Sequence, residues 1–117
     1  MFEKIIEEAL RDAGGHAAVL MGFDGIPVET VTVEGELDIE TVGMEFSVLL
    51  KEVRKAAESL ETGVTEELTV KTDQLSTVLR VVNDEYFIAM AVPPRGNLGK
   101  ARYLMRLLSP RLAADLV

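Results

Sequence analysis

The sequence predicts an α+β fold, in which three helices cover a central five-stranded antiparallel sheet in the order α-β-β-α-β-β-β-α. Apolar residues recur at helical spacing in three segments, β-rich runs occupy five others, and the loops between most of these runs suit hairpins. The 117 residues, 48% of them hydrophobic, fit a single domain spanning 1–117 and leave no room for a second one.

The first part of the chain predicts a helix followed by a hairpin. Apolar residues at helical spacing place the helix over 2–12, and Gly14-Gly15 ends it. An apolar run at 16–23, the dipeptide Asp24-Gly25 and a β-branched run at 26–33 form a strong hairpin signal.

The most regular segment is 37–61, which predicts a long helix that ends at Thr62-Gly63. Its apolar residues recur at alternating spacings of three and four, so they share one side of the helix. We expect this stripe to face the sheet; its members are Ile39, Val42, Phe46, Leu49, Val53, Ala56 and Leu60.

Three β-rich runs at 67–72, 75–82 and 86–92 predict an antiparallel meander, because short loops separate them. The run at 86–92 is apolar at odd and even positions alike, which is typical of a central strand buried on both faces. In the run at 67–72 apolar and polar residues alternate, which predicts an edge strand. Pro27 cannot donate to a ladder, so the second hairpin strand should be the other edge or start beyond this residue.

Asn97 is a good N-cap for a final helix that runs from Leu98 to about Leu108 and continues past Ser109-Pro110 to the terminus, with a kink or an end expected at Pro110. The charge of this end is distinctive. Residues 1–45 carry 2 basic and 11 acidic side chains, whereas 95–117 carry 5 basic and 1 acidic. The opposite signs indicate that the terminal helices lie beside each other; a docking surface is the alternative.

The overall composition excludes several classes of protein. A net charge of -8 disfavours partners that are recognised through phosphates, so we expect neither nucleic acid nor an anionic membrane as a partner. The absence of cysteine excludes disulfides and thiolate chemistry. The acidic N-terminus does not resemble a signal peptide, and the longest uncharged stretch is too short to span a membrane, so we expect a cytoplasmic protein.

Few residues in this sequence are of the types that commonly catalyse reactions. His16 is the single histidine and has no neighbour at metal-ligand spacing, so we interpret it as structural or exposed. The segment 96–100 weakly resembles a phosphate-binding loop but lacks its first glycine and the hydroxyl residue after Lys100. We therefore expect no enzyme, with no catalytic, cofactor or metal residue.

Two further faces of the long helix are candidate interaction surfaces. Opposite the apolar stripe, two apolar residues beside lysines form a candidate partner site, with scattered surface hydrophobicity as the alternative; this face holds Leu37, Met44, Val48, Lys51 and Lys55. Between the two faces lies a flank of slim residues that suits close packing against another helix: Gly43, Ser47, Leu50, Arg54 and Ala57. Gly43 costs the helix about 1 kcal/mol relative to alanine, which close packing would justify.

The element order and two local strings together resemble the roadblock/dynein light-chain family, and within it the bacterial MglB-like regulators of small GTPases. The first string is Ala17, Val19, Leu20 and Met21 leading into Phe23-Asp24-Gly25-Ile26-Pro27-Val28, which is similar to the first hairpin of the family. The second is Asn97-Leu98-Gly99-Lys100-Ala101-Arg102, which is similar to the start of its last helix.

The resemblance implies a roadblock/profilin-like fold and a non-enzymatic homodimer without a cofactor. In such a dimer the third strands, here with Leu68 and Val70, pair across the two-fold axis and the long helices lie side by side. The implied partner is a small Ras-like GTPase of the bacterial gliding and polarity type, regulated by scaffolding or by activation of GTP hydrolysis. A small-molecule sensor or scaffold domain with profilin- or PAS-like architecture is the alternative, and an enzyme is a more remote one.

Overall fold

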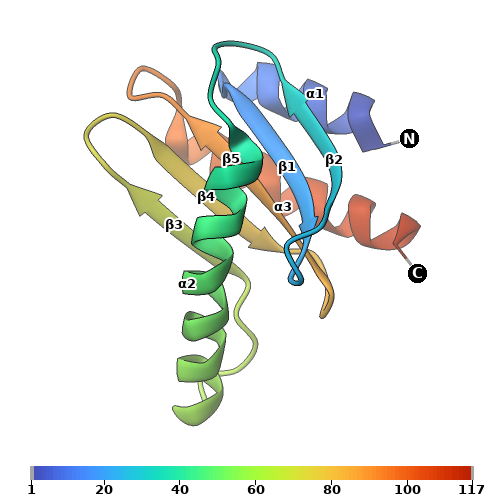
Figure 1. Cartoon of the computed structure of the whole chain (residues 1–117), viewed down its shortest axis with the longest axis vertical. Coiled ribbons are helices and arrows are strands. Elements are labelled where there is room, and N and C mark those ends of the chain that lie inside the picture. The colour runs from blue at the N-terminus through green and yellow to red at the C-terminus, as the bar shows by residue number, and fades with distance from the viewer. Residues whose placement is uncertain (1, 117) are drawn as a thin grey trace.

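The computed structural model describes residues 2–116 and confirms the predicted class and element order. Within these residues the chain forms one five-stranded sheet and three helices, arranged as in Figure 1. The elements are α1 (Phe2–Ala13), β1 (Ala17–Gly22), β2 (Pro27–Thr32), α2 (Ile39–Ser59), β3 (Glu67–Lys71), β4 (Ser76–Val81), β5 (Tyr86–Val92) and α3 (Leu98–Asp115).

The sheet is antiparallel throughout and has the strand order β2-β1-β5-β4-β3. The two edge strands are therefore β2 and β3, as Pro27 and the alternation of the third strand predicted. The register between β1 and β2 shifts at Leu20/Met21, where Pro27 pairs with Met21 at the start of the edge strand. A proline is tolerated here because an edge strand has a side that needs no ladder donor.

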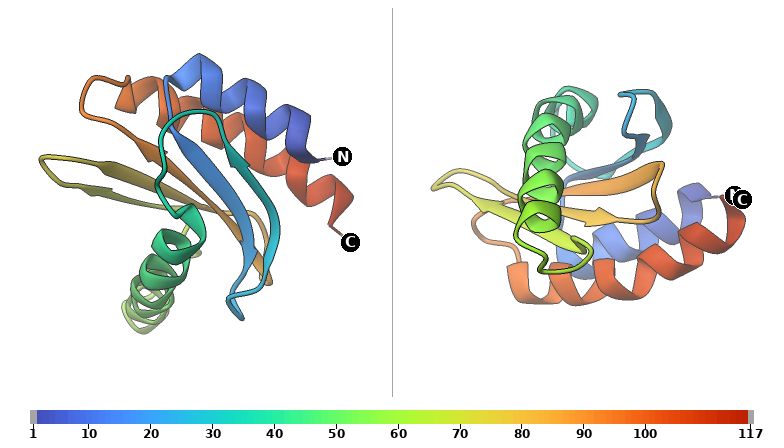
Figure 2. Two further views of the ribbon diagram at one scale, coloured as in Figure 1. Left: turned by 45° about the horizontal axis from the view of Figure 1, so that its top comes forward. Right: turned by 90° about the horizontal axis from the view of Figure 1, so that it is seen from below.

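The sheet is covered on both faces. Figure 2 shows α1 and α3 packed side by side on one face and α2 on the other. Each face has its own apolar core: one contains Ile6, Leu10, Met90 and Met105, and the other contains Val19, Met21, Leu50 and Phe87. The acidic first helix and the basic last helix thus lie beside each other, as their opposite charges predicted.

The side of α2 that faces the sheet differs in part from the expected stripe. Ile39 is buried as expected, and Val42 and Phe46 pack partly buried against the core, so the first half of the stripe faces the sheet. The other buried positions of the helix, however, are Gly43, Ser47 and Leu50. A Cβ atom on Gly43 would lie 2.9 Å from Cγ1 of Val19, so the missing side chain lets α2 approach β1 closely. Close packing at Gly43 is real, but its neighbour is the sheet rather than another helix.

The two ends of α2 also differ from expectation. The helix begins at Ile39 rather than at 37, and it ends at Ser59 rather than at Thr62-Gly63, with Leu60 as its C-cap. Glu61 follows in the left-handed region at φ 56°, and the Thr62 amide donates to the Ala57 carbonyl at 3.0 Å to close the end. In Figure 1 the C-terminal half of α2 extends beyond the strands, so the sheet does not cover it.

The last helix continues past Pro110 toward the terminus, as the sequence predicted, so the alternative that it ends at this proline is wrong. Asn97 caps it by accepting a hydrogen bond from the Lys100 amide at 2.9 Å, but Pro110 does not end it, and α3 continues to Asp115. Leu112, two residues beyond the proline, is fully buried against the sheet core. Burial of this last stretch offsets the hydrogen bond that the proline removes. No helix within residues 2–116 is long and apolar enough to cross a membrane.

Candidate interaction surfaces on α2 and β3

The outward side of α2 carries the predicted partner residues together. We call Met44, Val48, Lys51 and Lys55 the far-face strip; all four are exposed, Met44 at 52% and Val48 at 59%. Lys51 Nζ donates to the Phe23 carbonyl at 3.3 Å, which ties the strip to the turn between β1 and β2. Leu37, also expected here, instead packs partly buried against the core under α2.

The slim flank of α2 is not an open surface. Gly43, Ser47 and Leu50 lie in the core of the same chain, which corrects our expectation that they face a second copy. Arg54 is also engaged within the chain: its guanidinium lies 4.3 Å from the centre of the Phe23 ring and 3.9 Å from an Asp84 oxygen. Ala57, one turn further, is partly buried.

A second exposed apolar surface lies on the side of α2 nearer β3. We call Leu49, Val53, Ala56 and Leu60 the apolar flank; Leu49 is 44% and Leu60 72% exposed, and Val53 is partly buried. On the opposite side of the helix, Glu40 accepts from the Thr30 hydroxyl of β2 at 2.7 Å. Because successive residues are rotated by about 100° around a helix, the apolar flank points away from β2 and toward the β3 edge.

The free edge of β3 can be assigned residue by residue. The Val81 amide donates to the Glu66 carbonyl and the Thr72 amide to the Leu75 carbonyl, at the two ends of the β3–β4 pair. Since hydrogen-bonded pairs alternate along an antiparallel ladder, the peptide groups of Leu68 and Val70 face β4. Those of Glu67, Thr69 and Lys71 point outward.

The side chains of β3 divide between the two faces of the sheet. Leu68 packs against the core under α2, and Val70, two residues on, projects to the same face. Both are partly buried. Glu67, Thr69 and Lys71 project to the α3 face, where Glu67 pairs with Arg102 of α3 at 2.8 Å. The apolar side of β3 therefore continues the surface formed by the apolar flank.

The remaining sequence candidates have local partners. His16 Nε2 lies 3.7 Å from a Glu34 oxygen and 3.4 Å from an Arg95 nitrogen. Within residues 2–116 no group of three or more histidine, cysteine, aspartate and glutamate residues could hold a metal ion. In the loop-like segment 96–100, the Gly96 amide donates to the Pro93 carbonyl and the Lys100 amide to Asn97, so neither is free to bind phosphate.

The Asp38 carboxylate caps the start of α2. The Thr41 hydroxyl donates to Asp38 at 2.8 Å, and the Thr41 amide donates at 3.2 Å. These two hydrogen bonds hold the pKa of Asp38 below its ordinary value of 3.8, and the bond from the hydroxyl has the larger effect. The ionised carboxylate thus caps the helix that carries both candidate surfaces.

The fold and its solved neighbours define the class of the protein. A Roadblock/LC7 domain from Streptomyces avermitilis has a TM-score of 0.85 at 15% identity over 97% of this chain and 96% of that one. The gliding protein MglB from Thermus thermophilus has a TM-score of 0.85 at 16% identity, over 95% and 84%. Profilin II from Acanthamoeba castellanii shares the architecture more loosely, at 0.65 and 15% identity. This is a roadblock-type α+β domain.

One solved neighbour is also similar to this chain in sequence. MglC from Myxococcus xanthus is 38% identical over 93% of each chain, with a TM-score of 0.65. This TM-score is lower than that of MglB. Two solved Roadblock/LC7 structures from Streptomyces avermitilis also have unequal TM-scores against this chain, 0.85 and 0.62, so the TM-score varies even between similar domains. We therefore give sequence identity the greater weight. The chain belongs to the roadblock family, together with MglC. No family model and no curated protein sequence matches it.

Proposed function

We propose that the chain is a cytoplasmic, non-enzymatic homodimer that binds and regulates a small Ras-like GTPase of the bacterial gliding and polarity type. The observation that carries this proposal is that α2 leaves two apolar surfaces exposed after its own core face is covered: the apolar flank and the far-face strip. Two uncovered apolar surfaces on one helix suit one contact with a second copy and another with a partner.

The dimer would extend the sheet at β3. The outward peptide groups of Glu67, Thr69 and Lys71 offer unpaired donors and acceptors to an antiparallel strand. A register centred on Thr69 places Glu67 opposite Lys71 of the second copy and Leu68 opposite Val70 of the second copy. Opposite charges would then meet on one face and apolar side chains on the other, and both kinds of cross-strand pair stabilise sheets.

The same two-fold axis would bring the two apolar flanks together. The flank and the β3 edge lie on the same side of the molecule, so one axis can serve both. Full burial of an exposed leucine contributes about 1.5–3 kcal/mol, so covering Leu49 and Leu60, which are already partly covered, contributes less than this for each side chain. The C-terminal half of α2, which the sheet leaves uncovered, would thereby gain a packing partner.

The far-face strip would remain open in this dimer and provide the GTPase contact. Met44 and Val48 supply apolar area, and Lys51 and Lys55 add positive charge. A platform that binds one nucleotide state more tightly shifts the GTPase toward that state. Arg54 is held by Phe23 and Asp84 of its own chain, so we assign it no role in hydrolysis.

Binding of a purified MglA-type GTPase, loaded with GDP or with a non-hydrolysable GTP analogue, tests the proposal. Met44→Asp and Lys51→Glu should each weaken binding about tenfold, as the loss of a contact near an interface centre does. Lys4→Glu on exposed α1 is the control and should have no effect. Binding that both variants leave unchanged would contradict the far-face site, and stabilisation by a small molecule without any GTPase binding would favour the sensor alternative.

A further inference from the structure

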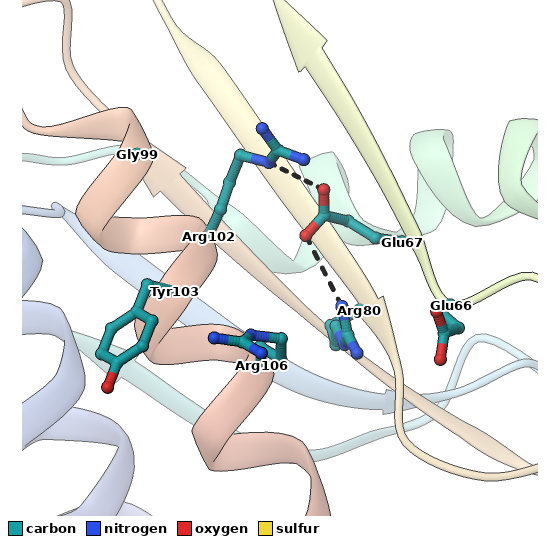
Figure 3. Close-up of a pocket in the computed structure, with 7 residues that line it drawn as sticks. All are labelled: Glu66, Glu67, Arg80, Gly99, Arg102, Tyr103 and Arg106. Atoms are coloured by element: carbon teal, nitrogen blue, oxygen red, sulfur yellow. Dashed lines mark hydrogen bonds and ion pairs between the residues drawn. The ribbon is translucent and has the colours of Figure 1, made fainter.

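A groove of about 550 Å³ lies on the sheet face opposite α2, between α3 and the β3–β4 hairpin. Figure 3 shows its lining, which consists of Arg80, Arg102, Arg106, Tyr103, Glu66, Glu67 and Gly99. The groove belongs to neither surface of α2.

Glu67 shows how the groove holds a carboxylate. Its Oε2 accepts from Arg102 Nε at 2.8 Å, and its Oε1 lies 3.7 Å from a terminal nitrogen of Arg80. Figure 3 shows the two arginines reaching this carboxylate from α3 and from β4. The two guanidinium groups therefore converge on one carboxylate, a geometry that arginine favours.

The arginines retain binding capacity beyond Glu67. Arg80 is only 15% exposed, yet its Nε has no hydrogen-bond partner among residues 2–116. Arg106 has its guanidinium 5.3 Å from the centre of the Tyr103 ring and forms no ion pair within the described part of the chain. A ligand cannot reach this buried nitrogen, so the groove can gain a new ion pair chiefly through Arg106, which is exposed.

We propose that this groove binds a carboxylate on an acidic segment of a partner protein. Three arginines against two glutamates leave one surplus positive charge, which matches a single carboxylate. Tyr103, 51% exposed, offers an aromatic face to a neighbouring apolar side chain of the peptide. The chain carries a net charge of -8, but the segment 95–117 holds 5 basic residues against 1 acidic residue, so an acidic partner is attracted to α3.

The glutamates make a carboxylate a better ligand than a phosphate group. A dianionic phosphate would meet the charges of Glu66 and Glu67 with only one surplus positive charge to offset them. A carboxylate can take the place of Glu67 on Arg102, whose side chain is 55% exposed. Glu67 thus acts as an internal competitor for the site.

Fluorescence polarisation of the full-length protein with a short fluorescein-labelled peptide of alternating glutamate and leucine tests the proposal. We expect binding that is lost when glutamine replaces glutamate in the peptide. Arg102→Gln and Arg106→Gln should each weaken it about tenfold, as the loss of one charge-assisted contact does. Glu67→Gln should tighten it, because this change removes the competing carboxylate.

Arg111→Gln is the matched control, since Arg111 is exposed on the same helix but lies outside the groove. Equal weakening by all three arginine variants would show non-specific charge attraction and overturn the proposal. Weakened binding in Glu67→Gln would overturn the competitor role. Displacement of the peptide by inorganic phosphate at lower concentrations than by acetate would reassign the groove to phosphate-bearing ligands. The groove and α2 lie on opposite faces, so GTPase binding can fail while this proposal stands.

Discussion

Gly43 of α2 lies directly against Val19 of β1: a Cβ atom at Gly43 would sit 2.9 Å from Val19 Cγ1 and 3.4 Å from Met21 Cε. Real Cβ atoms do not approach a neighbour within 3.0 Å, and the branched side chain of Val19 in a fully buried strand has little room to move. This contact sets how closely the long helix approaches the sheet.

Gly43→Ala should therefore destabilise the protein despite the higher helix propensity of alanine. Overpacking costs about 1–3 kcal/mol, and the propensity gain returns about 1 kcal/mol, so we expect a net loss of about 1 kcal/mol in the free energy of unfolding. Gly99→Ala is the control, because a Cβ there meets only Asn97 Oδ1, at 3.7 Å. Urea denaturation should show that variant unchanged or stabilised. A stabilised Gly43→Ala would mean that α2 is not packed against Val19.

The end of α2 contains a strained residue. Glu61 adopts φ 56°, a conformation that costs a residue with a side chain about 1–2 kcal/mol relative to glycine. Glu61→Gly should raise the free energy of unfolding by up to about 1 kcal/mol, after the greater entropy of the unfolded glycine is counted. Thermal denaturation measures this. A lower melting temperature would contradict the left-handed cap at this position.

The cap at the other end of α2 makes stability depend on pH. The pKa of Asp38 is lowered in the folded state, so its contribution is complete above the ordinary value of 3.8 and is lost as the pH falls through the lower folded-state value. The melting temperature of Asp38→Ala should fall below that of the wild type at neutral pH, and the gap should close well below pH 3.8. Asn97→Ala removes a cap that does not titrate, so the difference in melting temperature between this variant and the wild type should persist below pH 3.8.

The sequence was sufficient for the elements and their order but not for the orientation of α2. Periodicity located the helix, and the resemblance identified the family. The apolar stripe, however, is covered only in its first half: Ile39 is buried, whereas Leu49 and Leu60 continue the same spacing and yet lie exposed. The true core face contains Gly43 and Ser47, which a hydrophobic pattern does not select. Apolar periodicity does not distinguish a face buried within the chain from one left for a partner.

The arginine groove was missed for a different reason. Arg80 lies on β4 and Arg102 and Arg106 lie on α3, so only the fold brings them together. The sequence signal was the excess of basic residues in 95–117, which we explained by the neighbouring acidic helix α1. The far-face strip needed no such folding information, because its four residues follow each other along one helix.

Alternate amides of β3 face β4 or point outward, so proline substitutions at neighbouring positions should have different effects. Thr69→Pro removes an outward amide, so it should abolish dimerisation while the β3–β4 ladder keeps its hydrogen bonds. Val70→Pro removes an amide that faces β4, so it should destabilise the fold itself. Gel filtration combined with thermal denaturation distinguishes the two. Lys71→Glu, which would place two glutamates opposite each other, should weaken the dimer without unfolding the monomer.

Sedimentation equilibrium of the full-length chain tests the central claim of a dimer formed through α2 and β3 most directly. The account predicts twice the chain mass of 12.8 kDa at micromolar concentrations. Leu49→Glu should weaken the dimer about a hundredfold, since a symmetric interface contains each change twice, whereas Met44→Glu on the far-face strip should leave the mass unchanged. A wild-type mass of 12.8 kDa under these conditions, or a dimer that Leu49→Glu leaves intact, would contradict the account.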